Sequence, residues 1–304
     1  MSLDADAILD RRRLKRRLTL WRLAALAAVI TLAFIALFRV DLVTGRDHIA
    51  EIGVTGLIVD DDLRSELLQR VAENGRAKAL IVNIDSPGGT TIGGESLYHD
   101  IRLVAERKPV VGVVKTVGTS AAYLVAAATD HIVAGESSLT GSIGVLIQTA
   151  QFTGLLEKIG VSAEAIKSSP LKSVPSPLEP MTDEARDATQ AVIDDTHAWF
   201  VDIIANRRNL AADRIQQVAD GRLFTGRQAL QLGLIDEVGG RRQAREWLSK
   251  THNLSTALPL LKIEIDNSKR RLIERFMSVI GKTTLSERLT LDGLISLWHP
   301  QSVF

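Results

Sequence analysis

The chain has 304 residues, with 37 Lys and Arg against 36 Asp and Glu, and its 45% apolar content is enough for a sizeable core. The absence of cysteine excludes disulfides, thiolate metal sites and a cysteine nucleophile. The six histidines are too scattered for a His-rich metal site. The first 40 residues hold eight basic and three acidic groups, so the remainder carries a net charge of −4, which argues against nucleic acid as the main partner.

Residues 19–40 are predicted to form a membrane anchor. The uncharged run Leu23–Phe38 would span about 24 Å as a helix, and the strongly basic run Arg11–Arg17 precedes it. The positive-inside rule keeps that basic run, in a tail of residues 1–18, on the cytoplasmic side. The rest of the chain is then expected on the periplasmic side of the inner membrane. A cleaved signal peptide and a buried core helix are the alternatives, although no small-residue cleavage site follows the run.

Residues 47–250 alternate short β-branched runs with helical stretches, which predicts βαβ units and a mostly parallel sheet. The predicted strands are Ile49–Val59, Ala79–Ile84, Val110–Val114, His131–Ala134, Ile143–Gln148 and Val161–Ile166. The predicted helices are Asp61–Asn74, Thr91–Ala105, Ser120–Ala128, Phe152–Ile159, Thr182–Arg207 and Arg227–Gly233. The fold class is therefore α/β, preceded by a transmembrane helix.

Two further segments flank or interrupt this pattern. Ser168–Met181 carries four of the eight prolines and is predicted to be an ordered extended loop or a plain linker. Residues 251–304 form a C-terminal tail with amphipathic stretches at Arg270–Ile280 and Leu285–Trp298. That tail is equally compatible with an extra core helix, a subunit contact or an interfacial membrane helix.

The segment Leu80–Gly89 is the first that could carry chemistry. A buried strand runs into Asp-Ser-Pro-Gly-Gly, and the two glycines allow a tight turn with backbone N–H groups projecting outward. Adjacent N–H donors at the start of a helix can stabilise a developing oxyanion. A simple strand–helix turn is the competing interpretation.

The second segment places Ser120 at the mouth of a helix rich in small residues. Gly118–Ala122 resembles the nucleophile elbow of hydrolases, with Ala122 in place of the final glycine. A helix cap is the ordinary role of such a serine. No histidine lies in an obviously suitable loop to serve as its base, but Lys172 in the proline-rich loop could do so if burial lowered its pKa. A solvated surface lysine is the alternative.

Six segments occur together in order: Asp85–Gly89, Gly118–Tyr123, Leu139–Val145, Ile166–Pro177, Ala219–Gly226 and Leu232–Asp236. In combination they resemble the signal peptide peptidase family, SppA, in its short single-domain form. The resemblance implies a crotonase/Clp-protease-like fold and a Ser–Lys dyad. The family often has Gly-Gly after the serine, whereas this chain has Ala121 and Ala122.

The resemblance also implies roles for individual residues. It makes Ser120 the nucleophile and Lys172 the general base, with Ser142 holding the Lys172 amine in place. No metal or organic cofactor is expected.

The oxyanion donors implied by the resemblance are the backbone N–H of Ala121 and that of Gly88 or Gly89. The implied activity is that of a membrane-anchored serine endopeptidase acting on hydrophobic peptides such as remnant signal peptides. A ring-shaped homo-oligomer, with each site shared between neighbouring subunits, is also implied. A crotonase-type acyl-CoA enzyme and a catalytically silent membrane scaffold are the alternatives.

Overall fold

The computed structural model describes residues 18, 20–23, 25, 45–263 and 295–297. The chain divides into two units, Met1–Arg46 and Asp47–Phe304. None of the helices in the described residues is both long and apolar enough to cross a membrane.

Two of the predicted segments fall mainly outside these ranges. The cytoplasmic tail and anchor, residues 1–18 and 19–40, have only a few described positions, all of them in helical conformation. The C-terminal tail is described only as far as Ile263 and again at 295–297. The amphipathic stretch Arg270–Ile280 lies outside the described residues.

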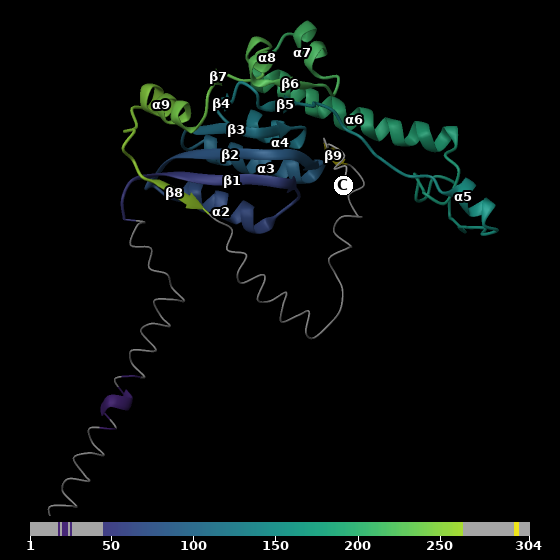
Figure 1. Cartoon of the computed structure of the whole chain (residues 1–304), viewed down its shortest axis with the longest axis horizontal. Helices are drawn as coiled ribbons and strands as arrows, with labels where there is room; N and C mark the ends of the chain where they lie inside the picture. Colours follow the sequence, from purple (N-terminus) through teal and green to yellow (C-terminus); the bar gives the residue numbers. More distant parts are fainter. Residues whose placement is uncertain (1–17, 19, 24, 26–44, 264–294, 298–304) are drawn as a thin grey trace, which may run out of the picture. The chain divides into compact units, whose positions relative to one another are not determined.

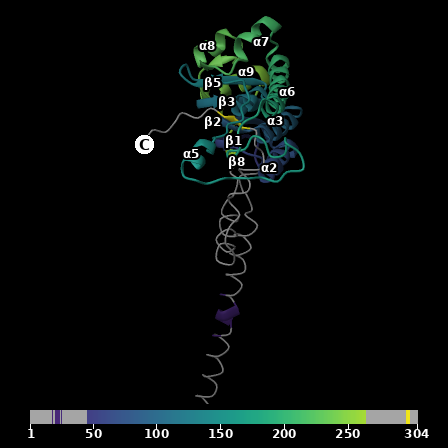
Figure 2. The same ribbon diagram turned by 90° about the vertical axis from the view of Figure 1, so that its right-hand side faces the viewer.

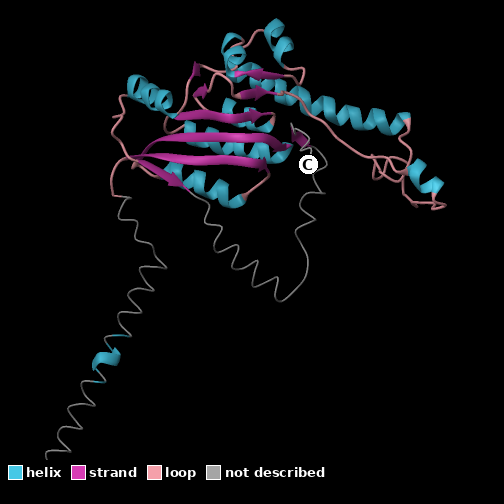
Figure 3. Cartoon of the chain, in the orientation of Figure 1, coloured by secondary structure: helices cyan, strands magenta, loops and turns pink. Residues whose placement is uncertain are grey.

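The described residues form one sheet of nine strands with a parallel centre. The strands β3 (Val110–Thr119), β2 (Ala77–Thr90) and β1 (His48–Ile58) are consecutive neighbours, with β8 (Leu260–Ile263) beside β1 and β4 (His131–Ala134) beside β3. Figure 3 shows the long central strands side by side. The predicted α/β class with a mostly parallel sheet is confirmed.

Four short strands complete the sheet. β5 (Leu139–Gly141) continues the parallel pairing at the end of β3, β6 (Leu223–Thr225) pairs antiparallel with β5, and β7 (Glu237–Val238) pairs with β4. β9 (Ile295–Leu297) pairs antiparallel with the last residues of β2. These three residues lie within the amphipathic stretch Leu285–Trp298, and they form a strand.

Helices cover both faces of the sheet, which explains why β2 reads as an almost unbroken apolar run. One face packs against α2 (Asp62–Glu73), α3 (Thr91–Ala105), α4 (Ala121–Ala127) and α6 (Asp183–Arg208). The other face packs against α9 (Arg241–His252) through Ala244 and Leu248. In the turned view of Figure 2, α2, α3 and α6 stand together on one side of the strands.

The segment of residues 145–181, called the arm below, departs from the predicted pattern. Its helix α5 (Thr153–Lys158) has no buried residue, and Figure 1 shows α5 at the far end of the arm, away from the sheet. The predicted strands Ile143–Gln148 and Val161–Ile166 are wrong. Leu146 makes only an isolated bridge, and Ile166 is 99% exposed, because neither run finds a neighbouring strand edge to pair with.

Three further helices lie after the sheet centre. α7 (Ala212–Val218) and α8 (Gly226–Gln231) follow α6, and α8 begins with a capping box between Thr225 and Gln228. The sequence pattern predicted α8 but neither α7 nor α9. The missed helices have 7 and 12 residues, and each buries only two residues.

Candidate active site

Two of the motifs singled out from the sequence meet where β2 and β3 end. Ser86 pairs in register with Gly118, and the Thr119 hydroxyl donates to the Pro87 carbonyl at 3.0 Å. The Thr140 hydroxyl, from β5, donates to the Gly118 carbonyl at 2.9 Å. Because β2 and β3 are parallel neighbours, their carboxyl ends bring the Asp-Ser-Pro-Gly-Gly segment of β2 next to Ser120.

Ser120 occupies the sharp turn between β3 and α4. Its φ of 58° and ψ of −125° are unusual for a residue with a side chain, and such a conformation costs about 1–3 kcal/mol. The turn is held by the Ser120 N–H, which donates to Gly141 at 2.8 Å, and by the Ser120 carbonyl, which accepts from Tyr123 at 2.9 Å. The Ser120 side chain does not cap α4, so capping does not explain the serine.

Gly88 and Gly89 lie near the end of β2 beside Ser120, and both are buried. The strand continues through them to Thr90, so the predicted tight turn is wrong. Gly88 has a φ of 116°, which suits glycine alone. A Cβ at Gly89 would lie 1.8 Å from the Ile58 carbonyl oxygen, so no side chain fits there. The Gly88 N–H donates to the Ser86 hydroxyl at 3.1 Å, and that hydroxyl donates to Gly56 at 2.6 Å, which braces this end of the strand.

Ser142 lies next to the Ser120 turn through the backbone. It directly follows Gly141, whose carbonyl accepts from Ser120, and its own N–H donates to Arg222 at 2.8 Å. Ser142 is half-buried and, like Ser120, has a positive φ, of 51°. Positive φ at two neighbouring serines indicates a locally strained site rather than a relaxed loop.

Lys172 lies on the arm and is exposed. Its backbone N–H donates to Ser169 at 3.0 Å, but within the part of the chain that the structure describes its side chain forms no hydrogen bond or ion pair. The neighbouring Lys167 pairs instead with Glu179. The single chain thus brings together Ser120, Ala121, Ser142 and the two glycines, and it leaves Lys172 in solvent.

A strand already lies along the edge of this site. β9 pairs antiparallel with Gly88, Gly89 and Thr90, on the side of β2 that β3 leaves when its chain turns into Ser120. The backbone edge between the glycines and the serine therefore accepts an extended strand.

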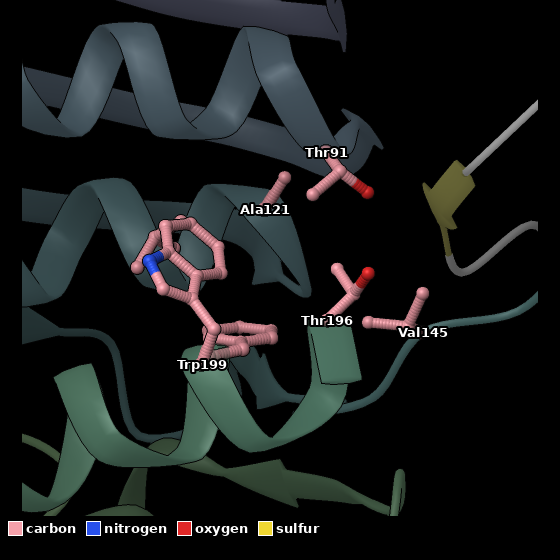
Figure 4. A pocket seen from close by; sticks show the side chains of 7 residues that line it. Thr91, Ala121, Val145, Thr196 and Trp199 are labelled. Atoms are coloured by element: carbon pink, nitrogen blue, oxygen red, sulfur yellow. The ribbon is translucent and has the colours of Figure 1, made fainter. Parts of the chain in front are cut away.

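A narrow pocket opens next to Ala121, and Figure 4 shows it between α3, α4 and α6. Its lining comes from α3, α4, the start of the arm and α6: Thr91, Ala121, Leu124, Val145, Thr196, Trp199 and Phe200. The sequence motifs did not indicate a contribution from α6. The sequence offered one indication, which is that a tryptophan and a phenylalanine are adjacent in one long predicted helix.

Other polar groups near the site are structural. Tyr123 is fully buried, and its hydroxyl donates to the Leu234 carbonyl at 2.8 Å; burial raises the pKa of this phenol far above its usual value. No cluster of His, Asp and Glu among the described residues could hold a metal ion. The chemistry that this arrangement can perform is nucleophilic attack by a serine beside backbone N–H donors.

Comparison with known proteins shows the family to which this chain belongs. Residues 102–255 match the model of peptidase family S49. A Synechocystis sp. protein named as a candidate protease, slr0021, is 37% identical over 222 residues, which cover 73% of this chain and 79% of that protein. The chain belongs to peptidase family S49.

Two other relatives carry more specific names. The chloroplastic serine protease SPPA of Arabidopsis thaliana is 33% identical over 84% of this chain and 39% of its own length. Protease 4 of Haemophilus influenzae is 27% identical over 65% of this chain and 34% of its own length. The resemblance to SppA-type proteins is therefore confirmed, and this S49 member is a serine peptidase.

Proposed function

We propose that this S49 peptidase is a membrane-anchored endopeptidase that uses Ser120 and Lys172 to hydrolyse hydrophobic peptides, including remnant signal peptides. The observation that carries the proposal is the conformation of Ser120. A serine is held at positive φ between the end of β3 and the start of α4, and its side chain does not serve as a cap. Such strain is retained where a nucleophile must be presented.

The reaction begins with the uncharged Lys172 amine. It takes the proton from the Ser120 hydroxyl while the serine oxygen forms a bond to the scissile carbonyl carbon. The negative charge that develops on the carbonyl oxygen is stabilised by the backbone N–H of Ala121 and that of Gly88 or Gly89. Because the Gly88 N–H already donates to Ser86, Gly89 is the better placed of the two glycines.

Collapse of this intermediate breaks the C–N bond. The Lys172 ammonium gives its proton to the leaving amine, and an ester between Ser120 and the acyl half of the peptide remains. Water then loses a proton to Lys172 and attacks the ester, after which Ser120 leaves and regains the proton. Ser142 positions the amine in both halves of the cycle. No metal or organic cofactor takes part.

Lys172 has to come from elsewhere, because the single chain leaves it in solvent. We assign it to the site of a neighbouring subunit in a ring-shaped homo-oligomer. The arm has the surface for such a contact: Phe152, Leu155 and Ile159 are 47%, 58% and 62% exposed, and an apolar group left in water favours association. Burial against a neighbour would also lower the Lys172 pKa, as a general base requires.

The proposed location follows from the sequence. Residues 19–40 anchor the chain in the inner membrane, the basic tail stays in the cytoplasm, and the peptidase unit faces the periplasm. A site tethered close to the membrane surface meets hydrophobic peptides as they leave the bilayer. An Enterococcus faecium relative, 31% identical over 62% of this chain, carries the name of a signal peptide peptidase, which supports this substrate class.

Substrates are proposed to bind as an added strand. The edge of Gly88–Thr90 pairs with β9 in the structure, so the same backbone groups can pair with an extended peptide. Pairing through the main chain suits peptides of varied sequence, because it leaves selectivity to the pockets for side chains.

The test uses the full chain in detergent with a fluorogenic hydrophobic peptide and a serine-directed fluorophosphonate probe. Ser120→Ala is expected to abolish both cleavage and labelling, whereas Ser249→Ala on α9 serves as the matched control and keeps both. Retained cleavage in Ser120→Ala would remove the nucleophile from the proposal.

Subunit mixing tests where the lysine comes from. Ser120→Ala and Lys172→Ala chains are each expected to be inactive, and mixing them under subunit exchange should restore part of the activity. Absence of restoration, with exchange shown by fluorescence energy transfer between labelled chains, would contradict the shared site.

A further inference from the structure

The pocket beside Ala121 is narrow and apolar. It offers about 10 Å³ to the centre of a water-sized sphere, which is the room of one water or one methyl-sized group. In Figure 4, Thr91 of α3 and Thr196 of α6 face each other across it, and the Trp199 ring forms a wall below Ala121. The aromatic ring is large and fixed, so it limits how far any group can enter.

The position of the pocket connects it with the reacting peptide. Ala121 directly follows the nucleophile Ser120, and Thr91 directly follows the edge Gly88–Thr90 that pairs with β9. A peptide strand bound along that edge would run beside Thr91 towards Ser120 and Ala121. Because side chains of a strand alternate in direction, the residue next to the scissile bond can point its side chain into the pocket.

Neither threonine hydroxyl opens onto the pocket. The Thr196 hydroxyl donates to the Val192 carbonyl at 2.8 Å, within its own helix. The Thr91 hydroxyl oxygen is buried, and the accessible lining of the pocket is apolar. A side chain that enters the pocket therefore meets methyl groups and the Trp199 ring.

We infer that Trp199 sets substrate selectivity by limiting the acyl-side residue at the scissile bond to a small uncharged side chain such as Ala or Ser. This inference rests on the proposed function and specifies its substrate class. Trp199 takes no part in the chemical steps, so it is specificity-determining rather than catalytic.

The experiment compares peptides that differ only at that residue: Ala, Ser, Leu and Phe. The full chain in detergent should cleave the Ala and Ser peptides with kcat/KM about tenfold or more above the Phe peptide, because a few methylene groups are worth that much in a tight pocket. Trp199→Ala should raise the Phe-to-Ala ratio by about tenfold or more. Trp199→Phe, which keeps an aromatic wall, should raise it less and guards against loss of folding.

Trp247→Ala is the matched control. Trp247 is also half-buried on a helix, but it stacks on His131 at a ring distance of 4.8 Å and packs against the opposite face of the sheet. Its loss should leave the ratio between peptides unchanged.

The outcomes are separable. If Trp199→Ala lowers cleavage of all four peptides in proportion, the tryptophan is only a packing residue and the inference is overturned. If Ser120→Ala still cleaves, the proposed function fails first, whatever the ratios are. Cleavage that depends on Ser120 together with a Phe-to-Ala ratio unchanged in both Trp199 variants contradicts the pocket alone.

Discussion

The segment that carries Ser120 and the arm that carries Lys172 differ in how the chain covers them. Every residue of α4 is buried, and Ser120 itself is 1% exposed. The arm helix α5 buries none of its residues, and Ile166 is 99% exposed. One half of the proposed dyad is therefore built into the core, and the other half lies on a surface that this chain alone does not cover.

The difference shows which part of the site the fold of one subunit can provide. A strained serine needs rigid neighbours on all sides, and the junction of β2, β3 and β5 supplies them. A lysine base needs removal from water, which one subunit does not provide for Lys172. Activity is thus expected to depend on whatever covers the arm, whereas the stability of a single chain is not.

The largest effect that would sharpen this comparison concerns two lysines of the arm. Lys172→Met is expected to lower kcat by about a thousandfold or more, because it removes the proposed general base. Lys167→Met, five positions earlier, removes only the partner of Glu179 and should change kcat by less than about tenfold. Steady-state rates with one peptide measure both. Equal losses in the two variants would contradict the role of Lys172.

A second effect concerns stability. Leu80→Ala, at a fully buried position of β2, is expected to lower the free energy of unfolding by about 3 kcal/mol. Ile166→Ala on the arm should change it by less than about 0.5 kcal/mol in the dilute, unassembled chain. Urea unfolding followed by tryptophan fluorescence measures both. Similar losses would show that the arm packs more tightly than its exposure indicates.

Low pH should separate the two regions further. Burial raises the pKa of Asp236, but the hydrogen bonds and charge of Arg208 and the Ile132 N–H outweigh this, so its pKa lies below the usual 3.8. Because the pKa of Asp236 is lower in the folded state than in the unfolded state, the Asp236 carboxylate stabilises the fold at pH values above its unfolded pKa. That contribution is lost as the pH falls through its folded-state pKa.

The expected pH effect is modest. Asp236→Asn should remove about 1 kcal/mol of stability at pH 7, and the difference from the parent should shrink as the pH falls below about 4. Glu179→Gln on the arm is the control. Unfolding free energies measured from pH 7 to pH 3 decide the point, and a constant difference across that range would contradict the assignment to Asp236.

The smallest effect concerns two serines with positive φ. Ser120→Gly is expected to be about 1 kcal/mol more stable than Ser120→Ala, because glycine adopts a φ of 58° without strain. Ser173 on the arm has a φ of 64°, but it is exposed, so its backbone can relax. The same pair of substitutions there should differ by less. Equal differences at both sites would mean that burial does not hold Ser120 in place.

Much of the sheet could be predicted from local pattern. The helix Thr91–Ala105 has the bounds that the sequence indicated, and β2 and β3 contain the predicted runs. α9 was missed although Ala244, Trp247 and Leu248 recur at helical spacing, because frequent charged residues mask that pattern. The runs Ile143–Gln148 and Val161–Ile166 were misread, since β-branched composition does not provide a neighbouring strand.

The candidate site was also predictable only in part. The closeness of Gly88 and Gly89 to Ser120 was predictable, because motifs at the ends of consecutive parallel strands share one edge of the sheet. The pocket wall formed by Trp199 was not, since it depends on how α6 crosses the body. The β9 pairing was also unpredictable, because three residues form a strand there through contact with a distant edge rather than through their own pattern.

The junction of α3 and α4 has a consequence for sequence variation in this chain. A Cβ added at Gly94 would lie 2.9 Å from the methyl carbon of Ala121, so the two helices have room for one methyl group at their crossing. The alanine that follows Ser120 is therefore tied to a glycine twenty-seven positions earlier. Exchanging the two residues should conserve volume, whereas adding bulk on either helix alone would wedge the crossing apart and displace the backbone beside the serine.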